Sequence, residues 1–192
     1  MEVIEKYRET VKSFLPKKRY EHSLLVAEKA VELSGRWGAD ENKALVAGLF
    51  HDIMKYESEE KLLNLISGGG IILNASQMAN PAVWHGYASA VFVRDTIGIK
   101  DEEIFDAIFY HSTGKADMSV LTKIIYLADM ISDDRVYEEA DILRELSVKN
   151  LDLAVKTAIS MSIDFLEEKG KSLCDDSYKA LDFLEKQDIK GV

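Results

Sequence analysis

Apolar residues recur every three or four positions along most of the chain, which is the spacing of an amphipathic α-helix. One such pattern fills residues 20–38, and its apolar positions are Leu25, Ala27, Ala30, Val31 and Leu33. We expect Gly35 to end this helix, because glycine commonly follows the last helical residue. The alternation of polar and apolar residues that marks a strand is weak throughout. The pattern therefore predicts an all-α fold of six to eight helices and no sheet.

Capping and breaking residues place the ends of several of these helices. Asp40, Asp101 and Ser119 each precede a helical pattern and are good N-cap residues. The two prolines, Pro16 and Pro81, lie where a helix is expected to break. Further helices are expected to begin near residue 85 and to span about 148–170 and 176–187. No internal repeat or domain boundary is visible along the chain.

Composition and charge narrow the class of protein. The 192 residues are 47% hydrophobic and 30% charged, which is typical of a globular protein with one buried core. The net charge of −10 argues against nucleic acid and membranes as partners, because both need basic surface. An acidic protein that binds a small polyanion must concentrate positive charge locally, and a metal ion does this compactly. The single Cys174 and the lack of a signal peptide or membrane span predict a cytoplasmic location.

All four histidines lie within helical patterns rather than in polar loops. His22 is near the start of one helix, His51 follows the apolar run ALVAGLF, and His85 comes just after a proline break. His111 shares a helix face with isoleucines three and seven residues earlier. A single histidine of this kind is usually a hydrogen-bonded core residue. Four of them with inward placement favour a shared site.

Two aspartates have the same inward placement as the histidines. Asp52 directly follows His51, and Asp129 lies four residues after Ile125 within KIIYLADMIS. A helix cap or an ion pair is the alternative role for Asp129. Four imidazoles and two carboxylates directed into one helical core fit a transition-metal site better than six separately satisfied polar groups.

The order of these residues resembles the H…HD…D signature of the HD-domain metal-dependent phosphohydrolases. The matching residues are His22, His51, Asp52 and Asp129, with His85 and His111 where two-metal members carry two more histidines. The segments KRYEHSLLVAEKAVELSGRWG, KALVAGLFHDIMK, WHGYASAVF and AIFYHSTGKADMSVLTKIIYLAD resemble the YqeK branch over roughly residues 18–159. That branch comprises symmetrical diadenosine tetraphosphate hydrolases that use iron.

The resemblance implies a helical HD domain over residues 1–192, with a metal-site core at about 18–135 and C-terminal helices at about 148–188. One metal is expected on His22, His51, Asp52 and Asp129, and Asp52 is expected to bridge to a second metal on His85 and His111. Attack of a metal-bound hydroxide on the phosphate is the expected reaction. Iron, as one or two ions, is the expected cofactor, and manganese, cobalt or zinc also suits these donors. The expected catalytic residues are Asp52, Lys55, His85 and His111.

Positive charge near the expected metals marks candidate phosphate contacts. Lys55 lies one turn after His51 on the same helical pattern and is the best candidate to stabilise transition-state charge. An ordinary helix-terminal lysine is the alternative, as are a solvated basic patch for the run KKR and a C-cap for the glycine of HSTG. Relatives carry Glu-Pro where this chain reads ISDDR, which leaves the contact at its arginine open. The expected substrate-binding residues are Arg19, Lys55, His85, His111, Thr113, Gly114 and Arg135.

The expected substrate is a dinucleoside polyphosphate, and two alternatives stay open. An HD phosphohydrolase can act on another substrate, namely a nucleotide, a deoxynucleoside triphosphate or an alarmone. A nucleotide-binding sensor with little turnover would keep the same pocket. Nucleic acid and membrane are not expected as partners, and a homodimer is left open.

Overall fold

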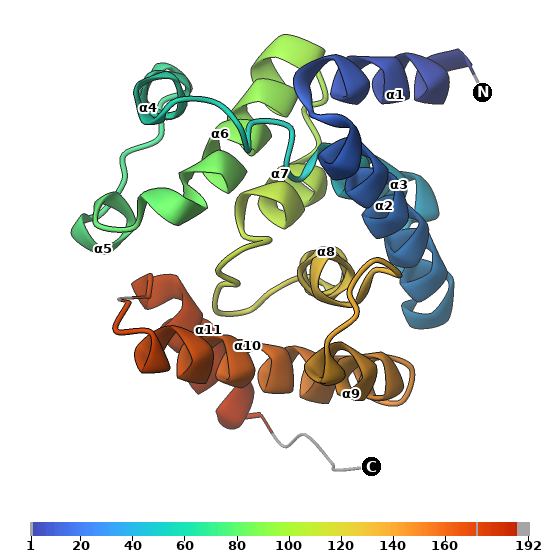
Figure 1. The fold of residues 1–192 in the computed structure, drawn as a ribbon, viewed down its shortest axis with the longest axis vertical. Coiled ribbons are helices and arrows are strands. Elements are labelled where there is room, and N and C mark those ends of the chain that lie inside the picture. The colour runs from blue at the N-terminus through green and yellow to red at the C-terminus, as the bar shows by residue number, and fades with distance from the viewer. Residues whose placement is uncertain (1, 172, 188–192) are drawn as a thin grey trace.

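The computed structural model describes residues 2–171 and 173–187, and within these ranges the chain forms eleven α-helices and no strand (Figure 1). This confirms the all-α class predicted from hydrophobic spacing. The predicted number of six to eight helices is too low, because α1, α4, α5 and α9 were not expected. The helices are α1 (Glu2–Phe14), α2 (Lys17–Trp37), α3 (Glu41–Phe50), α4 (Glu59–Gly68), α5 (Ala75–Met78), α6 (Trp84–Phe92), α7 (Glu102–Phe109), α8 (Val120–Ile131), α9 (Glu138–Ser147), α10 (Leu151–Glu168) and α11 (Asp175–Glu185).

The three predicted N-caps are confirmed. Asp40, Asp101 and Ser119 each accept hydrogen bonds from backbone N–H groups in the first turn of the helix that follows. These N–H groups have no partner within the helix, so the side chains fix where α3, α7 and α8 begin. All three helices carry or precede residues of the candidate site.

The predicted end of α2 at Gly35 is wrong. The helix continues to Trp37, and Gly38 then adopts the left-handed conformation with φ of 74°. The indole N–H of Trp37 donates to the carbonyl oxygen of Ser147 at 2.8 Å, which fastens the last turn of α2 to the end of α9. A glycine inside a helix costs only roughly 0.5–1 kcal/mol relative to alanine, so a tertiary contact of this kind is enough to extend the helix.

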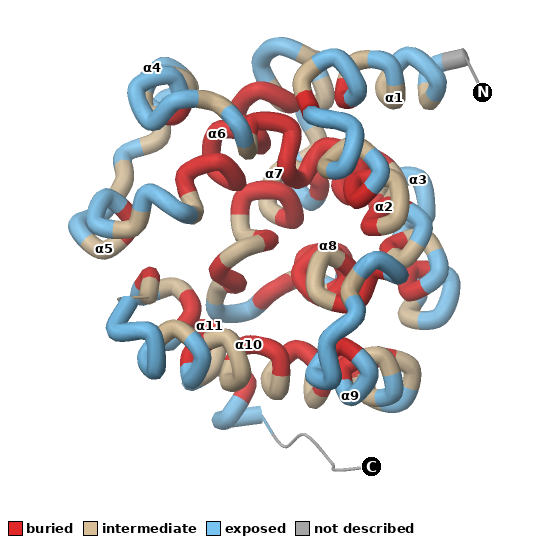
Figure 2. The backbone as a smooth tube through the Cα atoms, in the orientation of Figure 1, coloured by how far each residue is buried: buried red, intermediate tan, exposed pale blue. Residues whose placement is uncertain are grey.

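The helices surround an interior formed chiefly by α2, α3, α6, α7 and α8. α2 packs against α3 and α8, while α7 lies between α3, α6 and α8. Figure 1 shows α9, α10 and α11 as a layer along one end of the molecule, and Figure 2 shows buried backbone concentrated on the inner helices. One hydrophobic cluster extends from Val11 in α1 to Leu184 in α11.

The expected domain limits remain a prediction, and residue 188, the expected end of the C-terminal helices, lies outside the described ranges. No helix within those ranges combines the length and apolar character that a membrane crossing requires.

Candidate metal centre

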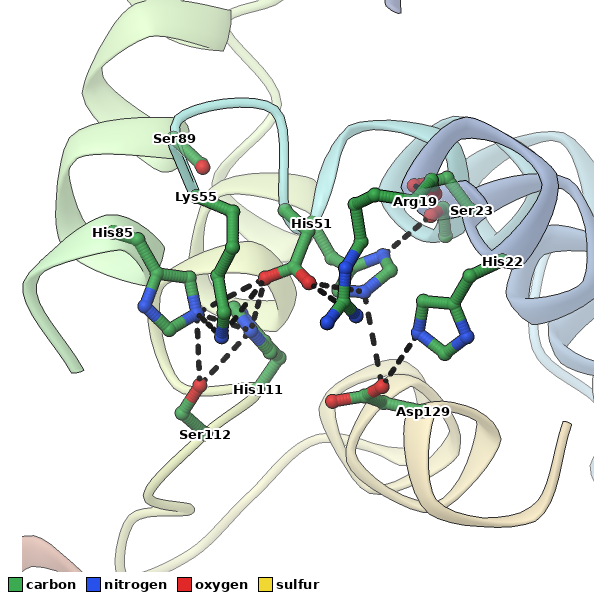
Figure 3. Close-up of polar contacts among 12 residues, drawn as sticks. Arg19, His22, Ser23, His51, Lys55, His85, Ser89, His111, Ser112 and Asp129 are labelled. Carbon is green, nitrogen blue, oxygen red and sulfur yellow. Dashed lines mark hydrogen bonds and ion pairs between the residues drawn. The ribbon is translucent and has the colours of Figure 1, made fainter. Parts of the chain in front are cut away.

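Four buried histidines from separate parts of the chain meet in the interior. His22 comes from α2, His51 from the end of α3, His85 from the first turn of α6 and His111 from the turn after α7. Ring centroids are 5.6 Å apart for His22 and His51, and 5.1 Å apart for both His51–His111 and His85–His111. Figure 3 shows the rings gathered around a common centre. Their predicted inward placement is confirmed.

Three of the histidines have the same local hydrogen bond, which fixes their tautomer. In each, Nδ1 lies against the backbone carbonyl oxygen three residues earlier. A carbonyl oxygen only accepts, so Nδ1 carries the proton and Nε2 presents a lone pair that can bind a cation. The pairs and their N···O distances are His51 with Gly48 (2.7 Å), His85 with Ala82 (2.8 Å) and His111 with Ile108 (2.7 Å).

Asp52 lies among three of these Nε2 atoms, with only 1% of its side chain exposed. Its Oδ1 is 3.0 Å from Nε2 of His85 and 3.5 Å from Nε2 of His111, and its Oδ2 is 3.5 Å from Nε2 of His51. Within the described structure, both Asp52 oxygens and His51 Nε2 are buried without a hydrogen-bond partner. Buried polar atoms without partners are costly. A divalent cation among them would supply the missing partner.

Asp129 extends the cluster toward His22. Its Oδ1 is 2.9 Å from Nε2 of His22 and 3.9 Å from Nε2 of His51. Two groups of potential ligand atoms result, each with all its atoms within 4.8 Å of one another: His22–His51–Asp129 and His51–Asp52–His111. Imidazole nitrogens with carboxylate oxygens are donors that divalent transition metals accept. The residues present therefore fit one or two such ions.

The protonation states of the cluster also suit a cation. Burial by itself would raise the pKa of the Asp52 carboxyl, but the facing histidines, His51 most of all, hold it well below its usual range. Burial would likewise raise the pKa of the Asp129 carboxyl, but His22, His51 and Arg135 together hold it well below its usual range. Burial lowers the pKa of His85 to about 4. At neutral pH the cluster thus offers two carboxylates and a neutral His85 ring, as metal binding requires.

Three cationic side chains reach the cluster. Nη1 of Arg19 is 2.9 Å from Oδ2 of Asp52, and Nζ of Lys55 is 2.9 Å from Nε2 of His85 and 3.6 Å from Oδ1 of Asp52. Arg135 donates from Nε to the backbone carbonyl of Asp129 (2.7 Å) and from Nη2 to its Oδ1 (2.6 Å). The structure therefore brings Arg19 and Lys55 to the centre. Two of the N–H groups of Arg135 are already hydrogen-bonded to Asp129, a candidate metal ligand.

A pocket of about 240 Å³ lies beside the cluster. The residues that line it are Lys18, Arg19, His22, Tyr56, Asp134 and Arg135. Three cations and one carboxylate line this small pocket, so its charged lining is net positive in a protein whose net charge is −10. Tyr56, with 61% of its surface exposed, offers an aromatic face at the same place.

Thr113 and Gly114 contact the fold rather than the cluster. The hydroxyl of buried Thr113 donates to the Gly114 carbonyl, and Gly114 has φ of 67°. A Cβ on Gly114 would meet Ala180 at 3.3 Å and Ile159 at 3.5 Å, so this glycine allows the turn to pack against α10 and α11. The alternative role of Gly114 as a C-cap is wrong, because Tyr110 occupies that position at the end of α7. Its substrate contact remains a prediction.

Two residues close to the cluster were not expected from the sequence. Ser112 places its hydroxyl 2.9 Å from Nε2 of His111 and 3.3 Å from Nε2 of His85, as Figure 3 shows. Asp134 places Oδ2 at 2.8 Å from Nδ1 of His22. Ser112 directly follows a candidate ligand, which was an available signal. Asp134 is 112 residues from His22, and no local pattern joins them.

Comparison with known proteins agrees with this geometry. The HD domain family model matches residues 19–134, a range that contains every candidate ligand. The chain is 34% identical over 174 residues to the symmetrical bis(5'-nucleosyl)-tetraphosphatase of Bacillus subtilis (strain 168), covering 91% of this chain and 93% of that protein. The protein of the same name from Staphylococcus aureus is 30% identical over 191 residues, with 96% of each chain covered.

A solved structure shares the whole fold. The crystal structure of a predicted HD superfamily hydrolase involved in NAD metabolism, from Clostridium acetobutylicum, matches with a TM-score of 0.91 and 35% identity. The match covers 94% of this chain and 96% of that chain. The resemblance read from the ordered histidines and aspartates is thereby confirmed: the chain belongs to the HD-domain family.

Proposed function

We propose that this protein is a metal-dependent hydrolase that cleaves diadenosine tetraphosphate symmetrically into two molecules of ADP. One observation carries the proposal: four imidazoles and two carboxylates converge, three of their facing atoms have no hydrogen-bond partner in the described structure, and a cation-lined pocket lies beside them. A polyphosphate is a polyanion, and such a pocket attracts it. The names of the Bacillus subtilis and Staphylococcus aureus relatives support the same substrate.

The proposed metal ligands are His22, His51, Asp52 and Asp129 for one ion and Asp52, His85 and His111 for a second. A bound divalent cation lowers the pKa of a water molecule and attracts phosphate oxygens, which is the chemistry that phosphate hydrolysis needs. Iron is the proposed metal because the sequence resembles iron-using relatives, and manganese, cobalt or zinc would accept the same donors. A reducing cytoplasm would preserve ferrous iron and the free thiol of Cys174.

The chain's own residues would position the polyphosphate and stabilise developing charge. Lys18 and Arg19 line the pocket, and Lys55 contacts His85 and Asp52 in the cluster. In a symmetrical cut, water attacks the second of the four phosphorus atoms. The bond between that phosphorus and the oxygen bridging it to the third breaks, and the oxygen leaves with the third phosphorus. Negative charge then develops on the oxygen of the departing ADP. The Lys55 ammonium, one third exposed beside the cluster, is placed to stabilise it.

Product analysis tests the proposed reaction. Protein purified without chelator is incubated with diadenosine tetraphosphate and ferrous iron under reducing conditions, and the nucleotides are separated by chromatography. ADP as the sole product is expected. AMP together with ATP would contradict the symmetrical cut while keeping a metal-dependent hydrolase. No turnover with metal confirmed in the protein would contradict the substrate and direct attention to other nucleotides.

Replacing Lys55 with methionine should lower kcat by about 100- to 1,000-fold, which is the usual effect of removing one preorganised transition-state donor. Metal content should stay at the wild-type value, because a lysine ammonium is not a ligand. Metal analysis and steady-state kinetics measure the two quantities. Lys61→Ala is the matched control, since its amine pairs with Glu57 at 2.6 Å on the surface. Loss of metal from the Lys55 variant would show that its role is structural.

A further inference from the structure

His22 differs from the other three histidines in what its Nδ1 contacts. The others meet backbone carbonyls, whereas Nδ1 of His22 meets the carboxylate of Asp134, with an N···O distance of 2.8 Å to Oδ2. The opposite nitrogen, Nε2, is 2.9 Å from Oδ1 of Asp129. The two ring nitrogens thus lie between a carboxylate inside the cluster and one outside it. His22 is also the histidine that lines the cation-rich pocket.

The Asp134 side chain is 36% exposed, and each of its carboxylate oxygens has a contact that holds it in place. Its Oδ1 accepts a hydrogen bond from the hydroxyl of fully buried Ser132 at 2.7 Å. The segment that carries it is clamped from α9, because Arg144 donates to the carbonyls of Ser132 (2.9 Å) and Arg135 (2.6 Å). Contacts at both oxygens already restrict this partly exposed side chain, so less conformational entropy is lost when it orients the ring.

An anionic partner at Nδ1 has two effects on an imidazole. It fixes the tautomer with the proton on Nδ1, and its charge raises the donor strength of Nε2 more than a neutral carbonyl does. Both effects bear on the pocket as well, because His22 is the cluster histidine among the residues that line it. Asp134 lies within the segment ISDDR, so this segment has a contact with the cluster.

We propose, on the basis of the metal site proposed above, that Asp134 is a positioning residue that orients His22 and strengthens its Nε2 as a ligand at the Asp129 end of the cluster. Asp134 itself faces the outer side of the ring and binds no metal. Its neighbour Asp133 has the same side chain, is 74% exposed and lies 3.6 Å from Lys29. Asp133 therefore serves as a matched control.

The test is a titration of metal-free protein with Co²⁺, followed by the visible absorption of the bound ion. Asp134→Asn keeps an oxygen that accepts from Nδ1 but removes the charge, and Asp134→Ala removes both. We expect Kd for Co²⁺ to rise about 10-fold in the asparagine variant and up to about 100-fold in the alanine variant. Asp133→Asn should bind as the wild type does. Ser132→Ala, which only frees the carboxylate, should weaken binding in the same direction.

The outcomes separate the role of Asp134 from the metal site itself. A wild-type Kd and spectrum in both Asp134 variants would overturn the proposed role, as would an equal loss in Asp133→Asn. A lower unfolding temperature of the metal-free Asp134 variants with unchanged Kd would mean a merely structural loop contact. Failure of the wild-type protein to bind Co²⁺ would overturn the metal site and this role together. Turnover without any bound metal would overturn them as well.

Discussion

Replacing Asp52 with alanine is expected to abolish turnover and to remove the bound metal. Asp52 is the carboxylate at the centre of the cluster, and neither of its oxygens has a hydrogen-bond partner in the described structure. Its removal would leave Arg19 and Lys55 facing the histidines without their shared counterion, and these charges would repel a cation. We expect the rate to fall at least about 1,000-fold, or roughly 4 kcal/mol of transition-state stabilisation. Metal analysis and ADP release measure the two effects.

A surface aspartate provides the control for this variant. Asp106 on α7 pairs with Lys115 and is 35% exposed. Asp106→Ala should keep wild-type metal content and rate. Wild-type metal content and turnover in Asp52→Ala would contradict the arrangement in which Asp52 bridges two ions. Loss of turnover with one ion retained would instead restrict the site to a single metal held at the Asp129 end.

Removing the metal should lower the unfolding temperature of the wild-type protein by about 10 °C. Without a cation, the buried oxygens of Asp52 and Nε2 of His51 have no hydrogen-bond partner in the described structure, which is a cost that a bound ion relieves. A ligand at 1,000 times its Kd stabilises the folded state by about 4 kcal/mol. A chain of this size gains roughly 2–4 °C per kcal/mol. Calorimetry of the chelated protein with and without added Mn²⁺ measures the difference.

The Asp52→Ala variant is the control for the thermal experiment. Because this variant lacks the central ligand, its unfolding temperature should not respond to Mn²⁺. An equal rise in both proteins would show that the ion stabilises the fold at another place. An unchanged wild-type temperature, with binding saturated, would contradict the assignment of the cluster as a metal site.

Local chemistry explains why several helix boundaries were predictable. A side chain at an N-cap position bonds to N–H groups two or three residues later, so Asp40, Asp101 and Ser119 act through their own segment. The end of α2 was not predictable in this way. Its continuation past Gly35 depends on the contact of Trp37 with Ser147, and that contact joins residues 110 positions apart.

The candidate site likewise combines features that local spacing predicts with contacts that depend on distant segments. Spacing on each helix showed that the histidines and Asp129 point inward, and the ordered set carried the resemblance to the HD-domain family. The contacts of these residues with one another and with their neighbours could not be predicted from any single segment of the sequence. Examples are Arg19 against Asp52 and Asp134 against His22. Adjacency to His111 predicted a substrate contact for Thr113 and Gly114, which remains a prediction. The structure shows their packing contacts within the fold.

The sequence by itself determined the all-α class, the starts of three helices that build the site, and the inward placement of the four histidines, Asp52 and Asp129. These follow from periodicity and capping, which depend on neighbours within a few positions. The tertiary structure alone decided which of these side chains meet, where Arg19, Lys55 and Arg135 point, and that Asp134 joins His22. Such pairings depend on how helices distant in sequence pack, because periodicity shows that a face is buried and does not show what covers it.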